Sequence, residues 1–456
     1  MERLRGVGGT DPVGEGRLHC RTSTLPPRSV RAVLAVLPGP RYLWAPPDEP
    51  TFAGSGRAIA ISAADGYAVD SLMERIESVF ANRVTTSEYG DETPSLPPGD
   101  AMPRMFGGLS FHSDVRPGEP WSSFPAASFV VPRVSVAWRD DELVVGVAEY
   151  TDGDPESRLK STLDEVANRL IELPEPGSEP TGPGVSRLIR QTSRKRWRSQ
   201  VQRAVDRIQS GDLEKVVIAQ SKQALLEGSI SLPDVIARLA RSYPQCRRFC
   251  FEQAPGVTFF GATPERLVTK RDRTVDTEAL AGSTGRGDTP QEDEWLADEL
   301  GRSAKDLHEH RLVRDAIVDQ LDPVAESITT DDRTVRQLAT VQHLQTSINA
   351  VLNRDVHVLE LVDALHPTPA VGGLPPNVAL ETIKSTETFD RGWYAGPVGW
   401  VDANGNGSFA VAIRSALATE DQAALFAGAG IVSDSDPDRE WDEVQLKYRP
   451  ILDALV

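Results

Sequence analysis

Cysteine is scarce in this sequence, and three copies are too few for a framework of disulfide bonds. Cys246 and Cys250 also lack the paired spacing of a zinc ribbon. No run of about 18 apolar residues is present, so no membrane span is expected. The start, MERLRGVGGTDPVGEGRLHC, has no apolar signal-peptide core, which favours a cytoplasmic protein. Internal repeats and glycine-rich phosphate-binding loops are absent as well.

Lysine is nearly as scarce, with eight copies beside 41 arginines and 67 acidic residues. The net charge of −18 argues against nucleic acid as a partner, because no basic field is present to displace counterions from phosphates. High negative charge of this kind resembles that of proteins from salt-loving organisms, where it maintains solubility. Since the chain usually uses arginine as its simple cation, each lysine is a candidate for a specific role.

Three regions can be distinguished along the chain. Residues 1–51 are rich in Gly, Pro and Arg and predict a flexible N-terminal segment. Residues 52–175 alternate strands and helices, and the segment PEPGSEPTGPGVS (174–186) reads as a linker. Residues 187–456 contain further helices and a C-terminal β-meander, and we expect both parts to form one structural unit. Antiparallel meanders interleaved with helices favour an α+β layered sandwich over a doubly wound sheet.

The C-terminal stretch AGAGIVSDSDPDREWDEVQLKYRP joins a small-residue turn to a helix. Asp436 is placed to cap that helix, and Pro437 suits its first turn. Glu440, Glu443 and Lys447 then fall on one helix face. Such a stripe can be a solvated salt-bridged face or, beside a glycine turn that admits a ligand, a metal site.

Four further residues are chemical candidates on local grounds. Lys215 opens the strand KVVIAQ, whose apolar members indicate burial, and desolvation there would favour a neutral amine. An edge lysine that points to water is the alternative. Glu265 follows a proline turn in GATPERLV, and taken alone it could simply pair with Arg266. Asp306 and Glu309 lie one turn apart on a predicted helix.

Eight motifs occur in an order that resembles one family. These are KVVIA, FFGATPERL, TEALAGSTGRG, SAKDLHEH, HPTPAVGG, FDRGWYAGPVGW, FAVAIRSAL and AGAGIVxxSDPxxEWxExxxK. Together they resemble the chorismate-utilising enzymes, strongly from residue 187 onward and more weakly before it through GGLSF. The resemblance implies one large unit in which two β-sheets pack between helical layers, with the site in a deep cleft.

The resemblance also implies roles for the chemical candidates. Lys215 matches the general base that activates water for attack on C2 of chorismate, and Glu265 matches the acid that protonates the departing C4 hydroxyl. Glu309 and Glu443 match the ligands of a Mg²⁺ cofactor. Asp306 and Glu440, one turn away on each helix, are expected to support these ligands.

Further positions match the family's substrate-binding residues. Arg414 and Tyr394 correspond to groups that hold the enolpyruvyl carboxylate, a role suited to a forked guanidinium. The remaining matches, which line the cleft or lie near the ring, are Gly282, Ser283, His343, Ala370, Gly428, Gly430 and Lys447. For His343, a structural histidine is an equal alternative.

Within the family, TEALAG and HPTPAVGG resemble the isochorismate synthase branch, which isomerises chorismate by adding water at C2 and losing the C4 hydroxyl. Menaquinone biosynthesis is the expected pathway. Anthranilate synthases, which use ammonia and usually a glutaminase subunit, lack the base that Lys215 provides, so no glutaminase partner is expected. Ala281 replaces the nucleophilic lysine of aminodeoxychorismate synthases. Salicylate synthase is the nearer alternative, and a non-catalytic metal-binding protein on the same fold is the other.

Overall fold

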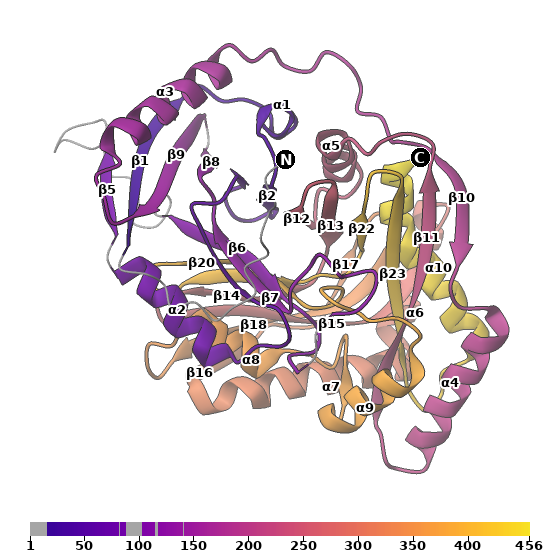
Figure 1. Cartoon of the computed structure of the whole chain (residues 1–456). Coiled ribbons are helices and arrows are strands. Elements are labelled where there is room, and N and C mark those ends of the chain that lie inside the picture. Colours follow the sequence, from indigo (N-terminus) through magenta and orange to yellow (C-terminus); the bar gives the residue numbers. More distant parts are fainter. Residues whose placement is uncertain (1–15, 82, 88–102, 115–116, 140) are drawn as a thin grey trace.

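The computed structural model describes residues 16–81, 83–87, 103–114, 117–139 and 141–456. Two large β-sheets face each other and helices cover their outer surfaces (Figure 1). All strand pairs of the described residues are antiparallel except the pair formed by β1 and β5. The predicted α+β sandwich with mainly antiparallel sheets is confirmed.

The larger sheet has 13 strands among the described residues, and β19 (Gly373–Leu374) pairs with β11 beside its main path. Its order is β10 (Val185–Arg190), β11 (Lys215–Leu226), β23 (Gln422–Ile431), β22 (Ser415–Ala418), β13 (Val257–Thr263), β12 (Arg247–Ala254), β2 (Arg41–Ala45), β3 (Phe52–Ser55), β8 (Val134–Arg139), β9 (Glu142–Thr151), β1 (Arg17–Leu25) and β5 (Val84–Ser87).

The smaller sheet has 10 strands in the described part of the chain, with β17 (Thr334–Gln337) attached to β18. Its order is β16 (Ala325–Thr330), β18 (Val341–Leu352), β15 (Thr274–Gly285), β14 (Arg266–Arg271), β21 (Gly407–Val411), β20 (Pro397–Asp402), β6 (Arg104–Leu109), β7 (Ala127–Val131) and β4 (Ile59–Ala63).

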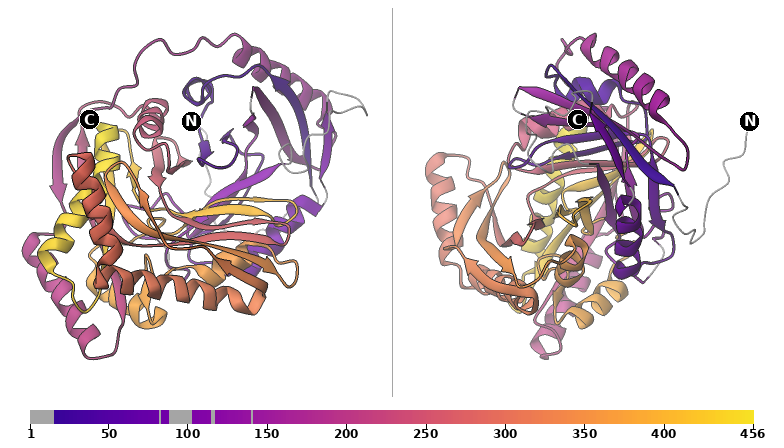
Figure 2. Two further views of the ribbon diagram at one scale, coloured as in Figure 1. Left: turned by 180° about the vertical axis from the view of Figure 1, so that it is seen from behind. Right: turned by 90° about the vertical axis from the view of Figure 1, so that its left-hand side faces the viewer.

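Helices pack on the two sheets from outside. On the larger sheet α10 (Pro437–Leu455) lies against β23, and on the smaller sheet α7 (Ala304–Leu321) lies against β15 (Figure 2). The other helices are α1 (Val30–Val36), α2 (Val69–Ala81), α3 (Glu156–Ile171), α4 (Arg194–Gln209), α5 (Leu232–Ser242), α6 (Pro290–Arg302), α8 (Val358–Leu365), α9 (Pro376–Thr386) and the 3₁₀ turn η1 (Asp322–Val324). None of the described helices is long and apolar enough to cross a membrane.

The start of α10 follows directly from its sequence. The Asp436 carboxylate accepts hydrogen bonds from the backbone N–H groups of Asp438 (3.1 Å) and Arg439 (3.0 Å), and Pro437 occupies the first helical turn. The cap fixes where the helix begins, and therefore which residues of its first turns face the sheet. Val444 and Tyr448 are buried on that face, close to Glu440.

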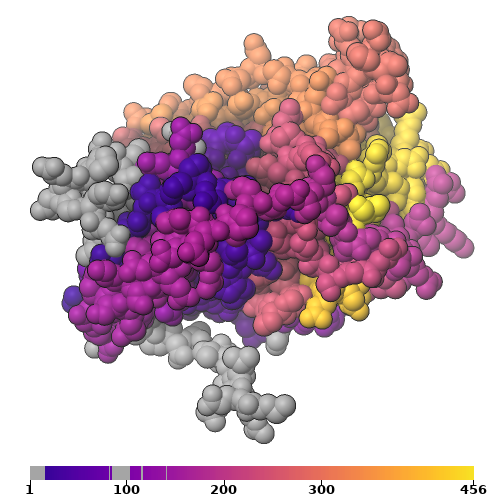
Figure 3. All heavy atoms as spheres, turned by 90° about the horizontal axis from the view of Figure 1, so that it is seen from above, coloured from indigo at the N-terminus to yellow at the C-terminus, as the bar shows by residue number. Residues whose placement is uncertain are grey.

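Both sheets contain strands from each side of the linker. In the larger sheet β2 pairs with β12, and in the smaller sheet β6 pairs with β20. Residues 172–184, which cover most of the expected linker, contain no helix or strand and connect α3 to β10. Seen from above, early residues in indigo and magenta and late residues in yellow share one face (Figure 3).

The N-terminal segment differs from expectation. Residues 1–15 lie outside the described part, but residues 16–51, expected to be flexible, form β1, α1 and β2. Strand β2 is hydrogen-bonded on both sides, by β3 and β12, and its Tyr42, Leu43 and Trp44 are fully buried. Pairing with β12, a strand about 200 residues later, stabilises β2. A short-range sequence pattern in a Gly- and Pro-rich stretch cannot reveal such a distant partner.

Candidate active site

A cavity with an empty volume of about 660 Å³ lies between the sheets and collects residues from distant parts of the chain. All thirteen residues expected to be catalytic, substrate-binding or metal-binding line it, whereas Asp306 and Glu440 do not. The lining consists of Lys215, Val217, Pro264, Glu265, Leu280, Ala281, Gly282, Ser283, Glu309, His343, Ala370, Val371, Tyr394, Ile413, Arg414, Ala427, Gly428, Gly430, Glu443 and Lys447.

Lys215 is the first residue of β11, and its side chain is only 1% exposed, so it is not an edge lysine in water. Its Nζ lies 2.9 Å from Glu309 Oε1 on α7. Gly430 on the neighbouring strand makes room for this pair, since a Cβ there would lie 2.5 Å from Glu309 Oε1 and 3.0 Å from Lys215 Cε. A buried amine and carboxylate thus meet where the strand backbone carries no side chain.

Glu265 lies at the turn between β13 and β14, and it does not pair with Arg266, whose guanidinium contacts Asp48 instead. Among the described residues Glu265 has no cationic partner within ion-pair distance, and its Oε1 is 3.3 Å from the Thr368 hydroxyl. Burial and then the charge of Glu278 raise the pKa of Glu265 to about 8, against the opposing charge of Lys215. The group is therefore a buried carboxylic acid that keeps its proton near neutral pH.

Glu309 on α7 and Glu443 on α10 line the cavity, and each forms an ion pair with a lysine. Glu443 Oε1 is 2.6 Å from Lys447 Nζ, which also donates to the Gly428 carbonyl at 2.9 Å. Burial alone would raise the pKa of Glu309, but lysine charges, chiefly that of Lys215, outweigh it and hold the pKa below its ordinary value.

Asp306 and Glu440 lie near Glu309 and Glu443 but outside the cavity lining. Glu440 is buried, its Oε1 is 2.9 Å from Lys305 Nζ, and burial followed by the charge of Glu443 raises its pKa to about 7. The Asp306 carboxylate accepts from the Ser303 hydroxyl, and burial raises its pKa too. In the part of the chain that the structure describes, no three or more His, Cys, Asp or Glu side chains are grouped as a metal site. The donor set itself, carboxylate oxygens from α7 and α10 at one cavity, suits a hard divalent cation.

Arg414 and Tyr394 line a less charged part of the wall. Arg414 follows β21 with a backbone φ of +52°, its side chain is buried, and burial lowers its pKa. No carboxylate among the described residues forms an ion pair with it, so its guanidinium is available to an anionic ligand. Tyr394 stacks on Phe426 with ring centroids 5.2 Å apart, and burial raises the pKa of its hydroxyl.

His343 and Ser283 lie beside each other on paired strands β18 and β15. The Ser283 hydroxyl is 3.0 Å from His343 Nδ1, and the buried His343 Nε2 has no hydrogen-bond partner within the described residues. Burial holds the pKa of His343 well below its usual range, so the ring is neutral. Gly282, with φ +76°, bends the backbone past Asp306 on α7, where a Cβ would be 3.0 Å from the Asp306 Cβ.

Sequence reasoning missed several residues of this site. The apolar walls formed by Val217, Leu280, Val371 and Ile413 carry no chemical signal in the sequence. Lys305 could have been found, because it stands in SAKDLHEH and is one of only eight lysines, three of which pair with acids of this site.

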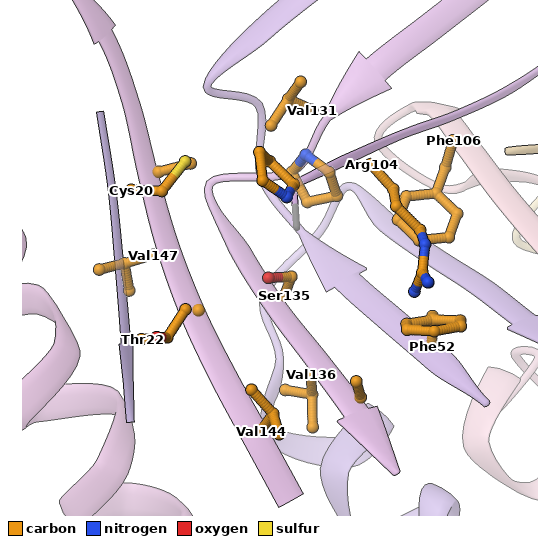
Figure 4. A pocket seen from close by; sticks show the side chains of 15 residues that line it. Cys20, Thr22, Phe52, Arg104, Phe106, Val131, Ser135, Val136, Val144 and Val147 are labelled. Carbon is orange, nitrogen blue, oxygen red and sulfur yellow. The ribbon is translucent and has the colours of Figure 1, made fainter. Parts of the chain in front are cut away.

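A second cavity, about 540 Å³ in empty volume, lies among the N-terminal strands (Figure 4). Its wall is mostly apolar, with Cys20, Thr22 and Ser135 as small polar side chains. The Arg104 guanidinium stacks between Phe52 and Trp400, at 3.8 and 4.2 Å from their ring centroids. No described carboxylate or histidine lines this space.

A buried amine, a buried carboxyl group with a raised pKa and a carboxylate pair line one cavity, so the site offers groups that can exchange protons and room for a small anionic ligand. The model of the chorismate binding enzyme family matches residues 17–456, and this chain belongs to that family.

Individual relatives agree with the family assignment. The chain is 39% identical over 361 residues to a "salicylate biosynthesis isochorismate synthase" of Pseudomonas aeruginosa, covering 78% of this chain and 75% of that protein. It is 31% identical over 422 residues to the "isochorismate synthase MenF" of Bacillus subtilis, covering 91% and 88%. The solved structure of the menaquinone-specific isochorismate synthase MenF from Escherichia coli has the same fold, with a TM-score of 0.79 at 23% identity, covering 97% of this chain and 96% of that one.

Proposed function

We propose that this chain is an isochorismate synthase, an isomerase that adds water at C2 of chorismate and releases the C4 hydroxyl as water. The observation that carries the proposal is the pair Lys215 and Glu265, which reach one cavity from strand β11 and from the turn between β13 and β14 and do not contact a common partner. The names of the relatives at 39% and 31% identity support the same activity.

In this proposal Lys215 is the general base, and its amine must be neutral when chorismate is bound. Binding of a cation by Glu309 would offset the carboxylate charge that favours the ammonium form. The Lys215 Nζ takes a proton from a water molecule while the water oxygen forms a bond to C2 of the ring. The ring double bonds shift, and the bond between C4 and its hydroxyl breaks. Because hydroxide is a poor leaving group, the hydroxyl needs a proton as it departs.

Glu265 supplies that proton. Its buried carboxyl is protonated below a pKa of about 8, so the acid form is present at neutral pH. The Thr368 hydroxyl contacts Oε1, which leaves Oε2 to carry the transferable proton. One proton is taken up at Lys215 and one is released from Glu265 in each turnover, so substrate and product have the same atoms and charge.

The remaining wall residues would orient the substrate. Arg414, a buried guanidinium without an ion-pair partner in the described chain, would bind the enolpyruvyl carboxylate together with Tyr394. Gly430 leaves room for the Lys215 and Glu309 side chains, and Gly282 and Gly428 also line the cavity. Ser283, His343, Ala370 and Lys447 complete the lining around the ring.

We propose Mg²⁺ as the cofactor, held by Glu309 and Glu443, with Asp306 and Glu440 behind them. Bound Mg²⁺ would neutralise the carboxylate of the ring and fix its position. The support is the excess of acids: Asp306, Glu309, Glu440 and Glu443 lie beside only three lysines. Burial and then the charges of Glu309 and Glu443 raise the pKa of Asp306. Their present lysine contacts occupy oxygens that a divalent cation would use.

Product analysis tests the function. The protein is incubated with chorismate and Mg²⁺, with and without ammonia or glutamine, and the products are separated by liquid chromatography. Isochorismate in equal yield in both reactions is expected, without a glutaminase partner. Salicylate with pyruvate would establish a salicylate synthase, an aminated product would establish an amination enzyme, and unchanged chorismate would contradict catalysis.

We also propose that the isochorismate supplies menaquinone biosynthesis. The relative that is named MenF covers more of both chains than the relative named for salicylate biosynthesis. Expression in a bacterium that lacks its own menaquinone-specific isochorismate synthase should restore menaquinone, measured in lipid extracts. A lack of rescue by a protein that is active in vitro would contradict this assignment.

A further inference from the structure

The turn that presents Glu265 is held from behind by a second carboxylate. Glu278, on β15, is buried and accepts a hydrogen bond from the Arg266 N–H through Oε1 at 2.9 Å. Its Oε2 accepts from Gln345 Nε2 at 2.5 Å and lies 3.3 Å from Arg336 Nη1. Glu278 therefore binds the backbone of the residue that directly follows Glu265 in the turn.

Arg336, on β17, completes this arrangement. Its Nη1 donates to the Pro264 carbonyl at 3.1 Å, and Nη2 donates to the Gln245 carbonyl at 2.9 Å. The residues on both sides of Glu265 are thus bound to one ion pair, Pro264 to the guanidinium and Arg266 to the carboxylate. The orientation of the Glu265 side chain therefore depends on the ion pair between Glu278 and Arg336.

We propose that Glu278 is a positioning residue for the acid step: with Arg336 it fixes the 264–266 turn, and its negative charge keeps the neighbouring Glu265 carboxyl in the proton-donating form. This inference rests on the proposed function of Glu265. Glu278 does not line the cavity, so it acts only through Glu265 and its turn.

The charges around Glu265 make the test specific. Glu278 favours its protonated form, Lys215 and Lys447 favour the ionised form, and the Thr368 hydroxyl also favours the ionised form. Tyr394 faces the same group and is neutral, because burial raises its pKa. Removal of the Glu278 charge while its shape is kept should therefore make Glu265 a stronger acid.

The test compares Glu278→Gln with Arg336→Gln. Glutamine at 278 can still accept from the Arg266 N–H but carries no charge, so the pKa of Glu265 should fall by on the order of one unit. Arg336→Gln removes the cation beside Glu278, so the pKa of Glu265 should rise. A purely structural role would give no such opposite shifts.

The pKa is measured by ¹³C NMR titration of protein labelled at the glutamate carboxyl carbon, with the Glu265 signal assigned by its loss in Glu265→Gln. The alkaline limb of the kcat/KM profile should move in the same direction. Asp293→Asn is the matched control, since Asp293 also binds an arginine (Arg286), a glutamine (Gln342) and a backbone N–H (Gly287), away from the cavity.

The inference is supported if Glu278→Gln lowers the Glu265 titration midpoint while Asp293→Asn leaves it unchanged. An unmoved midpoint in Glu278→Gln, or an equal shift in Asp293→Asn, overturns it. If Glu278→Gln does not fold, a midpoint in Arg336→Gln that stays or falls overturns it equally. The NMR readout needs no turnover, so a wild-type protein that makes no isochorismate refutes the proposed function separately.

Discussion

The two ends of the cavity handle buried charge in opposite ways. At the end formed by β11, α7 and α10, three carboxylates each have a lysine partner. Lys215 pairs with Glu309, Lys305 with Glu440 and Lys447 with Glu443. At the end formed by β13, β14 and β15, Glu265 has a second acid behind it and no cation within ion-pair distance among the described residues. The first arrangement holds the pKa of Glu309 below its ordinary value, and the second raises the pKa of Glu265.

The largest effect should come from the base. Lys215→Met keeps the length of the side chain but removes the amine, so turnover of chorismate should fall about 10²- to 10⁴-fold. The measurement is the initial rate at saturating Mg²⁺, with Lys195→Met on the exposed face of α4 as the control. Turnover near the wild-type rate would show that another group activates the water.

Glu265→Gln should have a similar effect for the opposite reason. Glutamine keeps the shape but cannot donate the proton, and we expect a loss of about 10²- to 10⁴-fold in kcat. In the wild-type protein kcat/KM should fall as the pH rises through about 8, because the acid loses its proton there. Residual activity of the variant should not show that decline. A variant that retains the same decline would assign it to another group.

Glu443→Gln should act on the metal requirement more than on the chemistry. Removing one carboxylate ligand should raise the Mg²⁺ concentration that gives half-maximal rate by about 10- to 100-fold, with a smaller effect at saturation. Rates across a Mg²⁺ titration provide the measurement. The same variant at Glu420, an acid on the surface away from the cavity, is the control. An unchanged titration would exclude Glu443 as a ligand.

The smallest effect should come from the backbone. Gly430→Ala places a methyl group 2.5 Å from Glu309 Oε1, which would push Glu309 and Lys215 apart and cost about tenfold in rate. Gly301→Ala, where nothing lies within 4 Å, is the matched control and should leave the rate unchanged. Equal rates for both variants would mean that the close approach at Gly430 is not needed.

Local patterns in the sequence predicted the fold class, and the family resemblance singled out residues that line the cavity. The cap of α10 is one example, since Asp436 and Pro437 act on the backbone of the next few residues. The motif order supplied the rest, because each motif that the family resemblance singled out contributes residues near one space.

Interactions between distant segments were not predictable in this way. Glu278 and Arg336 are 58 residues apart, and their link to the Glu265 turn exists only once β15, β17 and β18 are paired. Thr368 reaches Glu265 over 103 residues. The same limit applies to residues 16–51, where β2 depends on β12. A single sequence carries no pattern for such partners.

The pairing of β2 with β12 and of β6 with β20 has a consequence for how the chain can be divided. Cutting the irregular stretch at residues 172–184 would sever the polypeptide and still leave two halves joined edge to edge in both sheets. Deleting all residues before that stretch would instead expose the unpaired backbone amides and carbonyls of two central strands, β12 and β20. Exposed strand edges of this kind promote aggregation. The C-terminal half is therefore not expected to fold alone. Protein cleaved within residues 172–184 should stay assembled, whereas protein expressed without the N-terminal half should precipitate.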